Sequence, residues 1–472
     1  MRLFRLGQNE KFIFYFLSFF PIGFIYLISI DHSFFWDTSH LGSAQANWFF
    51  DNRLDSLYLP DSIDSGHPPF LGWLLALCWK IFGKGIVQSH LLMLPFIVLL
   101  CVQWSLIIRH YFDLNSFFLQ LLFFLNPYLL GQSMLVSPDI ILIAGFGLLL
   151  HGILANKNWK ILTGSIILSV VSLRGMSCIA GLGLFVFYLY YGKYINKSIF
   201  KKYLFLFIPS LGIASAFLMY HYFSKGWIGY HAHSPWASSF EKVNLTGFFR
   251  NILIALWRFC DQGLIFLWVF PLWLLYKKRR VLIFSKTTIN LFVLFTILII
   301  VLLLPQLLYA QLLMHRYFLP LVFILSLLAV SVMIDAKAFT KKIMLIHCLF
   351  LISGFFWIYP DGISKGWDAM PLHYSYYESR EEVLKKVAEF KIDKAKIGAS
   401  FPYDLSGSVL DLSDDKTEFA HLDFKSNEFI LYSNISNEFQ KSDIEELSLN
   451  WDKKFTCGTW PVTFILYERR RN

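Results

Sequence analysis

Long apolar stretches recur through the first 360 residues, and they restrict the fold of this chain more than any other feature. Hydrophobic residues make up 56% of the 472 residues, and the chain holds 50 phenylalanines, which no water-soluble chain of this length tolerates. The sequence therefore predicts a polytopic α-helical membrane protein. The stretches lie at about 12–30, 68–83, 87–108, 116–136, 139–155, 161–191, 203–223, 251–276, 287–304, 317–334 and 343–359.

Two of these stretches have lengths that do not match a bilayer. At about 1.5 Å per residue, 68–83 covers about 24 Å and 161–191 about 46 Å, against a hydrocarbon core of about 30 Å. Dividing 161–191 at Arg174 gives two crossings and removes a charge from the middle of the bilayer. With 68–83 in or near the interface, the chain has about 11 transmembrane helices. One long helix over 161–191, with 68–83 as a crossing, remains the alternative topology.

The positive charges lie in short clusters between the apolar stretches. The net charge of +10 would suit a nucleic-acid partner, but "KKRR" at 277–280 and the lysines of 192–202 and 335–342 follow the pattern of cytoplasmic loops. We therefore expect a lipid bilayer, and no nucleic acid, as the partner of these charges. The same pattern places the other ends of the helices outside the cytoplasm.

Residues 361–472 differ from the preceding part because they are polar. Residues 378–390 predict an amphipathic helix, and 395–400, 428–434 and 462–468 predict strands. We expect a transmembrane domain over 1–360 and a small α/β domain over 361–472, outside the cytoplasm. Acids in this second domain are scattered over its loops, which favours a role in binding over a role in chemistry.

Polar residues of the membrane part gather at the extracytoplasmic side of this topology. Acids and bases at the end of a bilayer are costly unless they are paired or used. We therefore expect a cavity with acidic and basic groups at the outer membrane surface. The candidates are Asp37, His67, Asp139, Arg174, His231, His233, Arg258, Asp261, His315 and Arg316.

Several candidates also have a structural interpretation. Arg258 and Asp261 are three residues apart and would pair on one helix. His231 and His233 would serve equally well as interfacial residues of a loop. Both interpretations stay open for these four residues at the level of the sequence.

A similar choice applies to the charges at helix ends. Asp139 follows Ser-Pro and would be a helix N-terminal charge favoured by the dipole. His315 and Arg316 would be membrane-end anchors. Asp37 is harder to explain in this way, because it adjoins "FFW" at the end of the first apolar stretch.

The segment "DSGHPPFLGWLLALCWKIFG" (64–83) joins a polar turn directly to an apolar helix. Gly66 permits the turn, the first proline fixes its φ, and Pro69 stands where helices begin. His67 is thereby held at the depth of the lipid headgroups. A protonatable ring there donates hydrogen bonds to an anionic headgroup.

This order of motifs resembles the superfamily C glycosyltransferases, GT-C. An early acid, Asp37, is followed by the amphipathic stretch "LGSAQANWFFDNRL" (41–54) and by His-Pro-Pro opening an apolar helix. Within the superfamily, the chain is similar to the branch of the protein O-mannosyltransferases and the bacterial lipid A aminoarabinose transferases. Similarity over residues 10–335 includes "SPDIILIAGFGLLLHGIL" (137–154), "SVVSLRGM" (169–176) and "HRYFLPLVF" (315–323).

The resemblance implies a hexosyl- or pentosyltransferase that moves a sugar from a polyprenyl-phosphate donor to a lipid, glycan or protein acceptor. It implies inversion at the anomeric carbon, with Asp37 as general base. The lipid phosphate would be bound by His67, Arg174, Arg316 and His315. Substrate contacts would come from Asp139, His231, His233, Arg258 and Asp261.

The sequence departs from its relatives directly after the early acid. Many relatives have a second acid there, and this chain has Thr38. We therefore assign no cofactor, and a divalent metal stays unassigned. The resemblance and composition together place the protein in the cell envelope, as a multi-pass protein of a bacterial inner membrane with its active site facing the periplasm.

Two other functions remain as alternatives. A polymerase or ligase for polyprenyl-linked glycans also has many crossings and a large outer loop, but it usually lacks the early Asp followed by His-Pro-Pro. A transporter for lipid-linked substrates would show inverted repeats and midplane charges. The charges here gather at one face instead.

Overall fold

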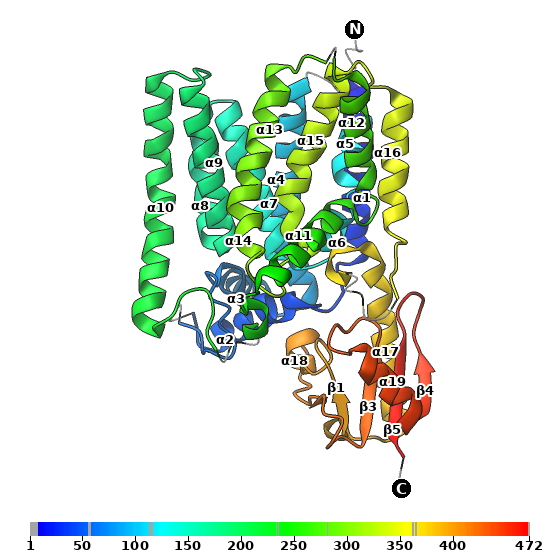
Figure 1. Cartoon of the computed structure of the whole chain (residues 1–472). Coiled ribbons are helices and arrows are strands. Elements are labelled where there is room, and N and C mark those ends of the chain that lie inside the picture. The colour runs from blue at the N-terminus through cyan, green and yellow to red at the C-terminus, as the bar shows by residue number, and fades with distance from the viewer. Residues whose placement is uncertain are drawn as a thin grey trace.

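The structure is a computed structural model that describes residues 8–54, 58–112, 117–232, 234, 236–280, 282–360, 363 and 366–470. A helical bundle forms its upper part in Figure 1, and a small sheet domain lies below the bundle. The bundle helices are α1 (Gln8–Ile28), α4 (Ile86–Phe112), α5 (Phe117–Phe124), α6 (Pro127–Ser133), α7 (Pro138–Leu154), α8 (Asn158–Val171), α9 (Leu173–Tyr191), α10 (Lys197–Lys225), α12 (Ile265–Lys278), α13 (Lys286–Leu298), α14 (Leu304–Gln306), α15 (Leu319–Asp335) and α16 (Lys341–Gly354).

The chain is a multi-pass membrane protein, as predicted. Within the described ranges, five helical runs are long and apolar enough to cross a bilayer: α4, α9, α10, the run 286–306 and the run 315–335. Shorter apolar helices include α7, α8 and part of α1. The count of about 11 crossings stays a prediction.

The predicted division of 161–191 is confirmed. Helix α8 ends at Val171, and α9 begins at Leu173. Ser172 between them is extended, and its Oγ accepts a hydrogen bond from the Gly175 amide at 3.1 Å. Arg174 therefore lies in the first turn of α9, directly after the break, and not in the middle of one long helix.

Two other apolar stretches are broken where the sequence predicted continuity. Within 116–136, Asn126 ends α5 and caps α6, because its Oδ1 accepts from the Tyr128 and Leu129 amides at 2.9 and 3.3 Å. Within 251–276, α11 (Leu245–Cys260) meets α12 at 95°. Gln262 and Gly263 have φ of 48° and 80° at this corner, which ends the right-handed helix.

The chain between α1 and α4 contains two packed helices at the lower end of the bundle (Figure 1). A π-helical turn, Ser39–Ala44, continues into α2 (Gln45–Asp51), and α3 spans Phe70–Phe82. Gly72 allows close packing, since a Cβ there would lie 2.6 Å from Gln45 Cβ. With 13 residues, α3 covers about 20 Å and is too short to cross a bilayer alone.

The C-terminal part is an α/β domain, as predicted. Its five strands have the order β2-β1-β3-β5-β4, with β1 parallel to both neighbours and the remaining pairs antiparallel. The predicted helix and three strands are confirmed as α17, β1, β3 and β5, whereas β2, β4, α18 and α19 were not predicted. The bounds are α17 (Tyr374–Glu389), β1 (Ile397–Ala399), α18 (Gly407–Leu410), β2 (Ala420–His421), β3 (Phe429–Ser433), α19 (Lys441–Asn450), β4 (Trp451–Cys457) and β5 (Phe464–Arg469).

The domain is docked on the bundle by shared core residues. Phe35, Trp36 and Leu135 of the membrane part belong to the hydrophobic core of the C-terminal domain. Gly131 allows the backbone of Met370 to approach α6 closely, because a Cβ at this position would lie 2.5 Å from the Met370 amide nitrogen. The domain boundary at residue 360 stays a prediction, and residues just beyond it pack against the membrane part.

Candidate active site

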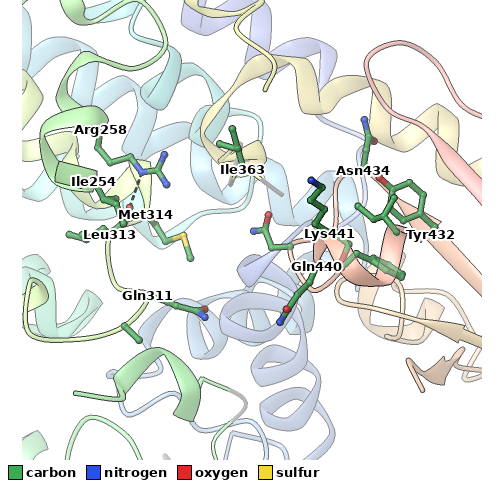
Figure 2. Close-up of a pocket in the computed structure, with 15 residues that line it drawn as sticks. Ile254, Arg258, Gln311, Leu313, Met314, Ile363, Tyr432, Asn434, Gln440 and Lys441 are labelled. Atoms are coloured by element: carbon green, nitrogen blue, oxygen red, sulfur yellow. Dashed lines mark hydrogen bonds between the residues drawn. The ribbon is translucent and has the colours of Figure 1, made fainter. Parts of the chain in front are cut away.

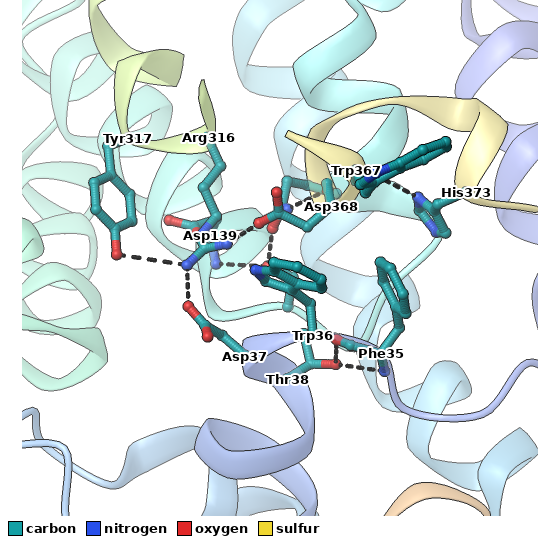
Figure 3. Close-up of polar contacts among 12 residues, drawn as sticks. Phe35, Trp36, Asp37, Thr38, Asp139, Arg316, Tyr317, Trp367, Asp368 and His373 are labelled. Atoms are coloured by element: carbon teal, nitrogen blue, oxygen red, sulfur yellow. Dashed lines mark hydrogen bonds and ion pairs between the residues drawn. The ribbon is translucent and has the colours of Figure 1, made fainter. Parts of the chain in front are cut away.

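Arg316 lies at the centre of a buried cluster of carboxylates (Figure 3). It belongs to the short helical turn His315–Phe318 that precedes α15, and its side chain is 5% exposed. Its guanidinium pairs with Asp37 and Asp368 through its two terminal nitrogens, and its Nε lies 3.2 Å from Asp139 Oδ2. Five donors in one plane make arginine the side chain that can serve three acids at once.

Asp139 connects this guanidinium to a second one. It stands in the first turn of α7, where the Ser137 hydroxyl accepts from its amide at 3.1 Å. Its Oδ1 lies 2.6 Å from a terminal nitrogen of Arg174. The Arg174 guanidinium also lies 3.9 Å from the centre of the Tyr317 ring, a favourable cation–π position. Asp139 therefore orients both arginines, and the first turn of a helix favours its charge.

Asp37 is the most exposed of the three carboxylates around Arg316. Its side chain is 20% exposed, against 4% for Asp139 and 3% for Asp368. The preceding Trp36 has φ of 54°, an unfavourable value for a bulky residue. This turn in the chain aims Asp37 at Arg316, and Asp37 and Asp139 both line a cavity about the size of one water molecule.

Asp368 was missed by the sequence analysis. It lies in a short helical turn, Trp367–Ala369, and its backbone carbonyl accepts from Gln132 Nε2 at 2.6 Å. A polar segment after the last apolar stretch gives no signal for an active-site role. In the structure the flanking Trp367 and Ala369 are both buried, so this segment packs inward.

His67 stands close to this cluster but outside its hydrogen bonds. Its ring is half-buried, and its Nδ1 has no hydrogen-bond partner among the described residues. Burial and the nearby charge of Arg174 lower the pKa of the His67 ring to about 4. The ring is thus neutral at neutral pH, and it offers one N–H donor instead of a positive charge.

A second group of charges fixes the loop that carries His67. Asp64 Oδ1 accepts from the Gly66 amide at 2.9 Å, and Asp64 Oδ2 lies 3.2 Å from His221 Nε2 and 3.4 Å from Lys225 Nζ. Burial raises the pKa of Asp64, but the hydrogen bonds from His221 and Gly66 outweigh it and leave the pKa below its usual value. These residues were not predicted, because their partners lie far apart in the sequence.

An apolar groove of 610 Å³ begins beside His67. Pro69, Phe217 and Tyr220 line both this groove and the small cavity around His67. The groove is thus bounded by the start of α3 and by the C-terminal half of α10. Its other lining residues are Leu54, Pro68, Phe70, Trp73, Ser169, Val170, Ile213 and Ala216.

Arg258, Asp261 and His315 form a separate buried network. His315 Nε2 lies 2.8 Å from Asp261 Oδ2 and 2.9 Å from a terminal nitrogen of Arg258, and Tyr359 donates to Asp261 Oδ1. Arg258 Nε donates to the Leu313 carbonyl at 3.1 Å. The network therefore fixes Leu313 and His315, next to Arg316.

Of the two loop histidines, His231 contacts the loop that carries His67. Its Nε2 lies 3.2 Å from the Asp61 carbonyl oxygen. His233 lies outside the described residues. Among those residues, no group of three or more His, Cys, Asp or Glu side chains is arranged to hold a metal ion.

Solved structures of ArnT from Cupriavidus metallidurans have a similar fold. The structure bound to undecaprenyl phosphate gives a TM-score of 0.52 at 10% identity and covers 98% of this chain and 98% of that chain. The apo structure gives 0.51 at 11% identity, with the same coverage. No family model and no curated protein sequence matches the chain. Since ArnT is a lipid A aminoarabinose transferase of the GT-C family, the predicted GT-C-like fold is confirmed.

Proposed function

We propose that this protein is a membrane glycosyltransferase that moves a sugar from a polyprenyl-phosphate donor to an acceptor hydroxyl. The observation that carries the proposal is an apolar groove that begins beside His67, whose ring lies near the charges of Arg174 and Asp37, in a chain with the fold of ArnT. ArnT has been solved with undecaprenyl phosphate bound. An apolar groove next to fixed cations suits a lipid of this kind, with a long apolar chain and an anionic head.

The reaction is an in-line displacement at the anomeric carbon. The acceptor oxygen forms a bond to that carbon, and its proton passes to the Asp37 carboxylate. The bond between the anomeric carbon and the phosphate oxygen breaks, and polyprenyl phosphate leaves with the electron pair. The configuration at the anomeric carbon is thereby inverted. Asp37 suits the role of base because its side chain is the most exposed of the three acids around Arg316.

Arg174 and His67 are the groups that we assign to the leaving phosphate. Arg174 is 19% exposed, and Asp139 is its one carboxylate partner within the described residues, so further guanidinium donors remain available. His67 adds one neutral donor at the mouth of the groove. Both would stabilise the negative charge that grows on the phosphate oxygen.

Arg316 and His315, which the resemblance also placed at the phosphate, suit a positioning role better. The Arg316 guanidinium is already engaged by three carboxylates. His315 is engaged by Asp261 and Arg258. We assign Arg316 to holding Asp37 and Asp139 in place, and the His315 network to holding the Arg316 turn.

A bacterial inner membrane with the active site facing the periplasm fits the distribution of basic residues. Lys277 and Lys278 end α12, and Lys341 begins α16. These helix ends lie at the upper end of the bundle in Figure 1, opposite the C-terminal domain. Basic residues favour the cytoplasmic side, so the site and the C-terminal domain would face outward.

The test uses purified protein in detergent with undecaprenyl-phosphate-linked single sugars and measures free undecaprenyl phosphate. We expect release by the wild type, and a donor KM raised about tenfold or more in Arg174→Gln, because one charged contact to phosphate is lost. The matched control, Arg279→Gln, changes an exposed arginine at the other end of the bundle. A wild type that releases no undecaprenyl phosphate from any single-sugar donor, but consumes oligosaccharide-diphosphate lipids, would favour the polymerase or ligase alternative.

A further inference from the structure

A second cavity lies between the membrane part and the C-terminal domain (Figure 2). It has a volume of 430 Å³ and is separate from the groove beside His67. One wall comes from α11 and the chain 310–314, and the other comes from the end of β3 and the start of α19. This volume lies in the range of small-molecule sites, which often form at domain interfaces.

The walls of this cavity present hydrogen-bond donors. Arg258 lines the membrane side, and one of its terminal nitrogens has no partner among the described residues. Gln311 on the same side and Asn437 on the opposite side carry side-chain amides with no protein partner in the described ranges. Unpaired amides facing a mixed polar and apolar space suit a ligand with many hydroxyl groups.

The cavity is also cationic. Lys441 begins α19 and stands opposite Arg258, and no Asp or Glu belongs to the described residues that line the cavity. The partner of Lys441, Glu445, is 3.9 Å away, and both side chains are largely exposed. An exposed pair of this kind is weak, so Lys441 stays available to an anionic ligand.

We propose that this cavity binds the anionic saccharide part of the acceptor. The inference rests on the proposed function, because it supplies the acceptor class for that same reaction. Amides fit the hydroxyl groups of a saccharide, and Arg258 and Lys441 fit its carboxylate or phosphate groups.

The cavity lies close to the carboxylate cluster around Arg316, so a ligand in the cavity can reach that cluster. Met314 lines the cavity and precedes Arg316 by two residues, a backbone separation of about 7 Å at most. Arg258 also contacts His315, the neighbour of Arg316. A saccharide in the cavity would therefore hold its next sugar unit near Asp37.

The test measures binding directly, by equilibrium dialysis of the full-length protein in detergent against labelled trigalacturonate, with maltotriose as the neutral trisaccharide. We expect trigalacturonate to bind more tightly than maltotriose. Lys441→Glu should weaken trigalacturonate binding about tenfold, because it reverses a charge that contacts the ligand. Lys425→Glu, on an exposed lysine of the same domain, is the matched control.

Each outcome of this test has one meaning. Equal binding of the two trisaccharides, equal loss in Lys441→Glu and Lys425→Glu, or no binding would overturn the inference. Asp37→Asn serves as a separate arm, since we expect it to bind trigalacturonate like the wild type. If trigalacturonate binds as expected but no donor sugar is ever transferred, the proposed function fails and the saccharide site stands.

Discussion

Asp37 and Asp368 come from opposite ends of the chain and pair with the same guanidinium, that of Arg316. Their shared partner means that the C-terminal part completes the active-site cluster instead of standing apart from it. Asp368 therefore helps to hold Arg316, and through it Asp37, in place.

Replacing Asp368 by Asn removes its charge while keeping the side-chain shape. Arg316 then loses one of its three charged partners, so its guanidinium holds Asp37 less firmly. We expect kcat to fall about tenfold with little change in the donor KM, since a misplaced base removes the acceptor proton more slowly. The control is Asp414→Asn, at an exposed acid of the same domain. A variant with the kcat of the wild type would contradict this role of Asp368.

His67 gives a prediction about stability and pH. Its pKa is about 4 in the folded protein and about 6.5 in an unfolded chain. Between these values the unfolded chain binds more protons, so folding stability falls as pH falls from about 6.5 to 4. In His67→Gln this contribution is absent, and Tm should fall less between pH 7 and pH 5 than in the wild type. His421→Gln, at an exposed ring, should follow the wild type. Parallel Tm curves for all three proteins would contradict the burial of His67.

At the scale of elements, the corner between α11 and α12 positions the network beside Arg316. Gly263 has φ of 80°, and a Cβ there would lie 1.9 Å from the Phe350 carbonyl oxygen. Gly263→Ala should therefore separate α12 from α16 and lower the free energy of unfolding by about 1–3 kcal/mol or more. The check is thermal unfolding in detergent. Gly212→Ala is the matched control, since nothing lies within 4 Å of that position, and its Tm should stay the same or rise slightly.

Helix breaks show what the sequence could and could not predict at this scale. The break before Arg174 was predictable, because a charge and an excessive length both argued against one helix. The breaks at Asn126 and Gly263 were not, because both stretches have a suitable length for one crossing. The first break depends on the Asn126 cap and the second on the positive φ of Gly263. Neither feature lowers the hydrophobicity of its stretch, so the hydrophobic pattern does not reveal the break.

At the scale of the whole molecule, the arrangement of the helices follows from the apolar bilayer and from the distribution of charged residues. Basic helix ends lie at one end of the bundle, and the C-terminal domain lies at the other (Figure 1). The carboxylate cluster joins the two parts through Asp368, and the groove borders the start of α3. The membrane character, the location of Asp37 and Arg174 away from the basic helix ends, and the fold class could be predicted, because each depends on local sequence. The contacts of Asp368, Asp64 and Lys225 could not, because they depend on how distant segments dock.

The proposed function requires Asp37 to act as the base of a sugar transfer from polyprenyl phosphate. The most direct test is the single-turnover rate of polyprenyl phosphate release at saturating donor and acceptor, in the wild type and in Asp37→Asn, with Asp51→Asn at an exposed position of α2 as control. Loss of a general base predicts a rate about 10²–10⁴-fold lower in Asp37→Asn, with donor binding retained. A rate within a few-fold of the wild type would contradict the account.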